Sequence, residues 1–152
     1  MKKLICLLLT VILTLSLAAC GSGNAQRGKQ TASAYLDQDE GTAVEVTVDL
    51  NGGWSVEFVR GAVYLYDGEI IEGKEGVAML ITLDKEVYEE NMAEAIADQN
   101  HKETDSGVYY TYYEDQGAYL TALDDSAFVL ITAMNKTDIE AIAAKFTLSL
   151  AD

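Results

Sequence analysis

Val77-Ala78-Met79-Leu80-Ile81-Thr82-Leu83 is the stretch that decides the fold, because every residue except Thr82 is apolar. A strand with one wet face alternates apolar and polar side chains, whereas a strand covered on both faces does not. Residues 128–133, Phe-Val-Leu-Ile-Thr-Ala, repeat this unalternating pattern. The sequence therefore predicts two central strands in a sheet that is covered on both sides.

Other expected strands surround these two. Residues 44–50 place valines and a leucine between Glu45, Thr47 and Asp49, which is typical of a half-buried strand. Asn51-Gly52-Gly53 follows as a turn. Because strands joined by short turns usually pair, the first three strands are expected to form an antiparallel meander. The expected outer strands cover residues 44–50, 54–58, 63–66, 108–114 and 118–123.

Two helices complete the expected order. Asp84 is placed to cap a helix that continues to about Asn100. Thr137-Asp138-Ile139-Glu140 matches a capping box, and Ile139, Ile142, Ala143 and Phe146 would line the buried side of a helix over residues 139–150. The predicted fold class is α+β: a mainly antiparallel sheet of about six or seven strands with two helices, arranged as a three-layer or helix-covered sheet.

This order resembles the PsbP-like α/β/α sandwich. The matching features are Trp54 after Gly52-Gly53 and a closing strand followed by the segment 139–150, and together they span most of residues 43–152. The resemblance implies a fold but no chemistry, because one fold supports many functions.

The amino-terminal segment has the order of a secretory signal. Lys2 and Lys3 precede an apolar run over residues 4–17, which is short for a membrane-spanning helix. Leu17-Ala18-Ala19-Cys20 resembles the lipobox of bacterial lipoproteins, in which a large aliphatic and two small residues precede a cysteine. The resemblance implies cleavage before Cys20, a diacylglyceryl thioether on Cys20, and a domain held on the extracytoplasmic side of the cell envelope.

The chain accordingly divides into three expected parts. Residues 1–19 form the signal peptide, residues 20–42 a lipidated cysteine and flexible tether, and residues 43–152 a single domain. The tether is assigned because the segment is rich in Gly, Ser, Gln and charged residues without a sustained apolar period. With Cys6 in the signal and Cys20 lipidated, the mature domain has no free thiol.

The charge of the mature chain restricts its partners. Removing Lys2 and Lys3 leaves 8 basic residues against 25 acidic ones, a formal charge of −17. Such a surface repels nucleic acid and anionic lipid headgroups, and it favours cationic partners or divalent cations. With one histidine, no zinc set of Cys and His is expected. Calcium at Asp124-Asp125 is chemically allowed but not specified, so no metal and no cofactor is predicted.

Tyrosines are the distinctive candidate binding residues. Tyr109, Tyr110, Tyr112, Tyr113 and Tyr119 fall within eleven residues. Alternation along a strand puts Tyr109 and Tyr113 on one face and Tyr110 and Tyr112 on the other. Tyrosine combines apolar area with a wet hydroxyl, which suits recognition of a protein or a glycan. Ordinary packing under a helix would also explain these tyrosines, and Tyr64 and Tyr66 could extend the patch or pack in the same way.

The leading hypothesis is a lipid-anchored envelope binding or accessory module without catalysis, whose partner is an envelope protein or cell-wall glycan. An inhibitor or immunity-type lipoprotein that binds a cationic protein is a form of it. The alternative is a small envelope hydrolase with two carboxylates in a cleft. His101 is the only histidine and lies in a polar connection near Asp105 and Ser106, but no catalytic motif surrounds it.

Overall fold

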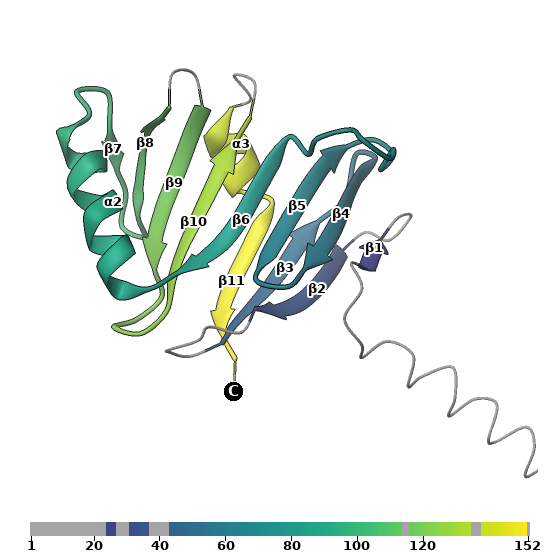
Figure 1. Cartoon of the computed structure of the whole chain (residues 1–152), viewed down its shortest axis with the longest axis horizontal. Coiled ribbons are helices and arrows are strands. Elements are labelled where there is room, and N and C mark those ends of the chain that lie inside the picture. The colour runs from purple at the N-terminus through teal and green to yellow at the C-terminus, as the bar shows by residue number, and fades with distance from the viewer. Residues whose placement is uncertain (1–23, 27–30, 37–42, 114–115, 135–137, 152) are drawn as a thin grey trace, which may run out of the picture.

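The computed structural model describes residues 24–26, 31–36, 43–113, 116–134 and 138–151 (Figure 1). Over these residues the protein is mainly antiparallel β, with ten strands of three or more residues in two sheets and two short helices. The elements are β1 Asn24–Gln26, β2 Thr31–Leu36, β3 Val44–Asp49, β4 Trp54–Val59, β5 Ala62–Asp67, β6 Ala78–Leu83, α2 Lys85–Ala97, the two-residue β7 Lys102–Glu103, β8 Val108–Tyr112, β9 Gln116–Ala122, β10 Phe128–Ala133, α3 Ile139–Ala143 and β11 Phe146–Leu150.

The large sheet has the order β1-β4-β5-β6-β10-β9-β8-β7, and all its neighbours are antiparallel. The two unalternating stretches become β6 and β10, which pair at the centre with Leu83 opposite Phe128. All six residues of β10 are buried, which confirms its prediction as a strand covered on both faces. In β6 the cover is incomplete, because Met79, Ile81 and Thr82 are only half-buried.

The small sheet has the order β11-β3-β2 and corrects three predictions. β3 does not pair with β4, so the meander of the first three strands is wrong at its first step. Residues 146–150 form β11 on β3 rather than the second half of a helix. Residues 31–36 form β2 on the other side of β3, inside the segment expected to be a tether. The expected count of six or seven strands is consequently too low, whereas the mainly antiparallel sheet is confirmed.

The large sheet has a different cover on each face. α2 packs over β8, β9 and β10, where Ala95 meets a cluster containing Tyr110, Leu120 and Phe128. The small sheet and α3 pack on the opposite face, where Val46, Phe146 and Ile142 join the larger core cluster. α2 does not extend over β4 and β5 (Figure 1). On this face of the large sheet, some side chains of β4 and β5 are therefore only half-buried.

The helix ends differ from their predicted caps. α2 begins after Asp84, but the Asp84 side chain makes no capping hydrogen bond, and the helix ends at Ala97 rather than near Asn100. α3 is capped by Asp138, whose Oδ1 accepts the backbone N–H of Glu140 at 3.0 Å. The predicted cap residue Thr137 lies outside the described residues. α3 has only five residues, because the chain turns into β11.

Candidate functional site

Tyr109 and Tyr119 lie on the face of the large sheet that packs against α3 and the small sheet. They are cross-strand partners in β8 and β9, with ring centroids 4.5 Å apart. Tyr119 is buried, and its hydroxyl lies 2.8 Å from Ser106 Oγ. This pair packs against the larger core cluster, so its rings are structural.

Tyr110 lies on the opposite face, beneath α2. It is 5% exposed, and its hydroxyl donates to Asn91 Oδ1 at 3.2 Å. Burial raises the pKa of Tyr110, followed by the effects of Tyr112 and the Glu94 carboxylate. The Tyr112 ring meets the Tyr110 ring edge-on, with centroids 6.2 Å apart. Tyr110 therefore fixes α2 on the sheet while Tyr112 lies at the margin of the contact.

Tyr113 is the most exposed tyrosine of this group, at 72%. β8 ends at Tyr112, so Tyr113 does not continue the alternation and does not share a face with Tyr109 as expected. Its ring instead meets Tyr112 edge-on at 4.6 Å, and its carbonyl accepts the N–H of Gln116 at 2.8 Å. Its φ is +45°, a left-handed conformation that is rare for a bulky side chain. Tyr112 and Tyr113 form what we call the tyrosine tip.

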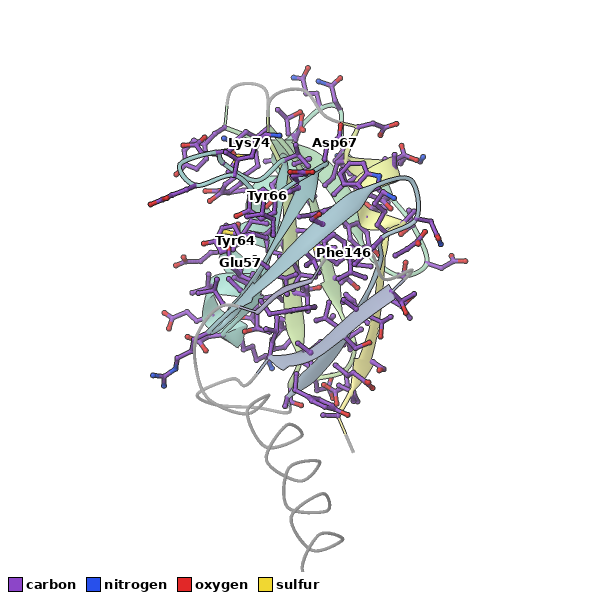
Figure 2. All side chains as sticks on the ribbon, turned by 90° about the vertical axis from the view of Figure 1, so that its right-hand side faces the viewer. Glu57, Tyr64, Tyr66, Asp67, Lys74 and Phe146 are labelled. Carbon is purple, nitrogen blue, oxygen red and sulfur yellow. The ribbon has the colours of Figure 1, made fainter. Side chains whose placement is uncertain are left out.

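Tyr64 and Tyr66 form a second group, on the part of the α2 face that the helix does not cover; Tyr64 is half-buried and Tyr66 is buried. Tyr66 Oη donates to Glu57 Oε2 at 3.1 Å, and burial, followed by Glu57, raises the pKa of Tyr66. Figure 2 shows Glu57, Tyr64 and Tyr66 on one side of the large sheet and Phe146 on the other. At the end of β5, Lys74 Nζ donates to the Asp67 carbonyl at 3.3 Å.

The strand register connects the two tyrosine groups in one row across the sheet. Tyr64 pairs with Met79, which pairs with Thr132, and Thr132 pairs through Ala118 to Tyr110. Thr132 is 3% exposed, and its Oγ1 has no hydrogen-bond partner among the described residues. Sequence reasoning missed both Glu57 and Thr132. Their only signal was a polar side chain within each strand.

His101 and Ser106, the residues considered for histidine-based catalysis, contact different partners. His101 Nδ1 lies 2.6 Å from the Asp98 carbonyl oxygen, and its Nε2 lies 3.4 Å from Glu103 Oε1. The Ser106 hydroxyl is directed to Tyr119 instead. The described structure therefore does not bring His101 and Ser106 together as a nucleophile and its base.

Two carboxylates, the half-buried Asp98 and the exposed Asp124, have lowered pKa values, and both accept hydrogen bonds from backbone N–H groups. The N–H of Asn100, followed by that of Thr111, lowers the pKa of Asp98. The N–H and then the hydroxyl of Ser126 lower the pKa of Asp124, so the position at which calcium was chemically allowed is a hydrogen-bonded turn. Among the residues that the structure describes, no three His, Cys, Asp or Glu side chains are grouped as a metal site would require.

Cys20 and the lipobox lie outside the described residues. Within the described ranges, no helix has the length and apolar character needed to cross a lipid bilayer. The likeness to PsbP-like domains stays a prediction. Comparison of the chain with protein-family models, curated proteins and solved structures finds no match.

Proposed function

We propose that this protein is a lipid-anchored binding or accessory module of the bacterial cell envelope and that it acts without catalysis. The lipobox-like Leu17-Ala18-Ala19-Cys20 supports the anchor, with Cys20 carrying the acyl chains and the domain on the extracytoplasmic side. More than one acyl chain is needed for stable attachment, because a single chain binds membranes only marginally.

The tyrosine tip carries the binding half of the proposal. The 72% exposed Tyr113 ring is presented by a backbone conformation that costs about 1 kcal/mol for a residue with a Cβ. A bulky residue in a sparsely populated backbone conformation at an exposed turn, with its ring on Tyr112 at the margin of the core, supports the hypothesis that the ring contacts another molecule. Tyrosine is enriched at the energetic centres of protein interfaces. The partner is an envelope protein or a cell-wall glycan.

Charge around the tip favours a cationic partner. The Glu94 carboxylate on α2 is close enough to contribute to the raised pKa of Tyr112, although burial and Tyr113 contribute more. A partner's arginine or lysine could lie on the Tyr113 ring and reach Glu94, combining a cation–π contact with an ion pair. The chain's formal charge of −15 acts in the same direction and disfavours nucleic acid. An inhibitor or immunity-type lipoprotein that binds a cationic protein fits this description.

The hydrolase alternative is less well supported. A glycosidase needs one carboxylic acid whose pKa is raised, so that it can donate a proton. Among the described residues, the two carboxyls with a clear pKa shift are Asp98 and Asp124; both pKa values are lowered, and both groups accept backbone N–H hydrogen bonds. These directions favour permanently ionised, structural carboxylates, which supports the binding module over the enzyme.

The anchor is tested by intact-mass analysis of the membrane-extracted protein and of Cys20→Ser. We expect a diacylglyceryl mass on the wild type, and release of the variant from membranes. A wild-type protein without lipid, or a variant that keeps it, would contradict the proposal.

Binding is tested by pull-down of the producing cell's envelope fraction with the detergent-solubilised lipoprotein. We expect Tyr113→Ala to reduce capture about tenfold or more. Tyr35→Ala is the matched control, because Tyr35 is a tyrosine of similar exposure, 64%, on the small sheet. An equal loss of capture for the two variants would show that the tyrosine tip is not the binding site. Capture that does not weaken between low and high salt would exclude the electrostatic part of the proposal.

A further inference from the structure

The place where the chain enters the large sheet is defined by β1. β1 is antiparallel to β4, with Asn24 opposite Phe58 and Gln26 opposite Val56. Asn24 therefore lies near the end of β4, beside the turn formed by Arg60 and Gly61 (Figure 1). The amino-terminal chain reaches the domain at this corner of the sheet.

Very little chain separates this corner from Cys20. Only residues 21–23 lie between Cys20 and Asn24. Four residue steps of fully extended backbone span at most about 14 Å. The expected 22-residue tether would have spanned roughly 25 Å on average. Because β1 and β2 are paired in the sheets, the chain between Cys20 and the domain is only residues 21–23, which we call the short leash. A lipidated Cys20 would hold the β4 corner against the membrane surface.

The register places the tyrosine tip at the opposite end of the sheet. Val59 is level with Val108 at the start of β8, through the pairs that run across β5, β6, β10 and β9. Tyr112, at the other end of β8, pairs with Gln116. Five residue steps lead from Val108 to Tyr113, which corresponds to about 17 Å along the strands.

The corner beside Asn24 also has the chemistry of a membrane contact. Arg60 and Val59 are both exposed, and Val59 is 41% exposed. Arg60 is the only basic residue between Trp54 and Asp67, in a chain with 25 acidic residues. A guanidinium favours lipid phosphates, and the negative surface potential of an anionic leaflet attracts a cation that lies near it.

We infer that the domain stands on the membrane with its β4–β5 turn against the lipid headgroups and its tyrosine tip directed away from them. The partner of the turn is the phospholipid surface that holds the acyl chains of Cys20. This orientation rests on the proposed lipid anchor, and it deepens that proposal. It places Tyr113 where a molecule in the envelope can reach it without displacing lipid.

Site-specific fluorescence quenching tests the orientation. The lipidated full chain carries a fluorophore on Val59→Cys or on Ile71→Cys, in vesicles of phosphatidylcholine and phosphatidylglycerol with a headgroup nitroxide quencher. Both positions are exposed and apolar; Val59 precedes β5, and Ile71 lies in the loop after it. We expect quenching at least about threefold stronger at position 59, from the separation along the strands. Equal quenching, or stronger quenching at position 71, would overturn the orientation.

Two further variants separate the causes. Insertion of about 20 Gly-Ser residues after Gly23 lengthens the leash to roughly 27 Å and should remove the asymmetry. An asymmetry that survives the insertion would overturn the short leash as its cause. Arg60→Gln should reduce quenching at position 59, relative to the protein with Arg60, in vesicles with phosphatidylglycerol but not in pure phosphatidylcholine. If the variant and the protein with Arg60 are quenched equally in both kinds of vesicle, the contact between Arg60 and the headgroups is wrong. Intact mass shows separately whether Cys20 is acylated, so failure of the anchor is distinguishable from failure of the orientation.

Discussion

The Asp98 carboxylate ties the end of α2 to the edge strand β8, because its Oδ2 accepts the backbone N–H of Thr111 at 2.7 Å. Its Oδ1 accepts the N–H of Asn100 at 2.9 Å. β7 covers β8 only at Val108 and Tyr109, so Asp98 satisfies a donor that the short edge strand leaves uncovered. The connection also supports the strand that ends at the tyrosine tip.

Asp98→Asn should lower the melting temperature at pH 7, because an amide replaces one of the two acceptor oxygens by a donor. The two N–H bonds lower the pKa of Asp98 in the folded state, so their stabilisation is present above the unfolded pKa and is lost as the pH falls through the folded one. The gap between wild type and variant should therefore narrow below about pH 4. Thermal unfolding followed by circular dichroism measures both effects.

The control for this prediction is Asp105→Asn, which removes an exposed carboxylate in the neighbouring segment between β7 and β8. If Asp105→Asn lowers the melting temperature equally, general charge and not backbone binding is responsible. A gap for Asp98→Asn that stays constant down to about pH 2 would contradict the linkage.

Much of the fold could be predicted because alternation along a strand reports which face is buried, and an apolar run without alternation reports that both faces are covered. The patterns over residues 44–50, 54–58 and 128–133 correspond to β3, β4 and β10. Alternation does not identify the neighbouring strand, however. Asn51-Gly52-Gly53 satisfies the chemistry of a hairpin turn, yet it carries the chain from the small sheet to the large one.

The missed strands had competing patterns. Ile139, Ile142, Ala143 and Phe146 fit a helical face, but residues 146–150 also alternate with period two, and pairing with β3 decides for the strand. In β2 the buried positions include Ala32 and Leu36. Most of the other residues of this segment are small or polar, so its sequence shows no clear alternation of apolar and polar side chains.

The candidate site was predictable in composition but not in geometry. The sequence indicated five neighbouring tyrosines, but burial depends on what packs over each face. Tyr110 is buried by α2, whereas Tyr113 escapes because β8 ends one residue before it. No local pattern reports where a strand ends to within one residue, and the accessibility of Tyr113 depends on that one residue.

Thr132→Val should stabilise the protein by about 1 kcal/mol, because valine keeps the shape and removes a buried hydroxyl that has no partner in the described structure. Thr121→Val is the matched control. Thr121 is equally buried, at 4% against 3%, but its hydroxyl donates to the Ser106 carbonyl, so the same change should destabilise by about 1 kcal/mol. Urea unfolding measures both, and effects of the same sign would contradict the assignment of Thr132 as unpartnered.

Gly107→Ala should destabilise the protein by about 3 kcal/mol, at the upper end of ordinary overpacking. A Cβ at Gly107 would approach the Leu120 carbonyl oxygen and would lie 2.8 Å from Tyr119 Cε2. Neither the backbone of β9 nor the buried ring can move freely. Ser106→Ala is the control, because it removes the neighbouring hydroxyl bond to Tyr119 without adding a Cβ and should cost only about 1 kcal/mol. Equal urea midpoints for the two variants would contradict the steric argument.

Tyr113→Gly should be more stable than Tyr113→Ala by about 1 kcal/mol, although glycine is normally the less stable of the two. Both variants lose the ring and its contact with Tyr112, so their difference isolates the left-handed φ of +45°. Thr111 is the control position, since it is exposed within β8, and there the order should reverse, with alanine more stable by about 0.5–1 kcal/mol. Urea unfolding of the four variants measures both differences. An alanine variant at position 113 as stable as the glycine variant would show that the backbone there is unstrained, and would remove the main reason for assigning Tyr113 to a partner.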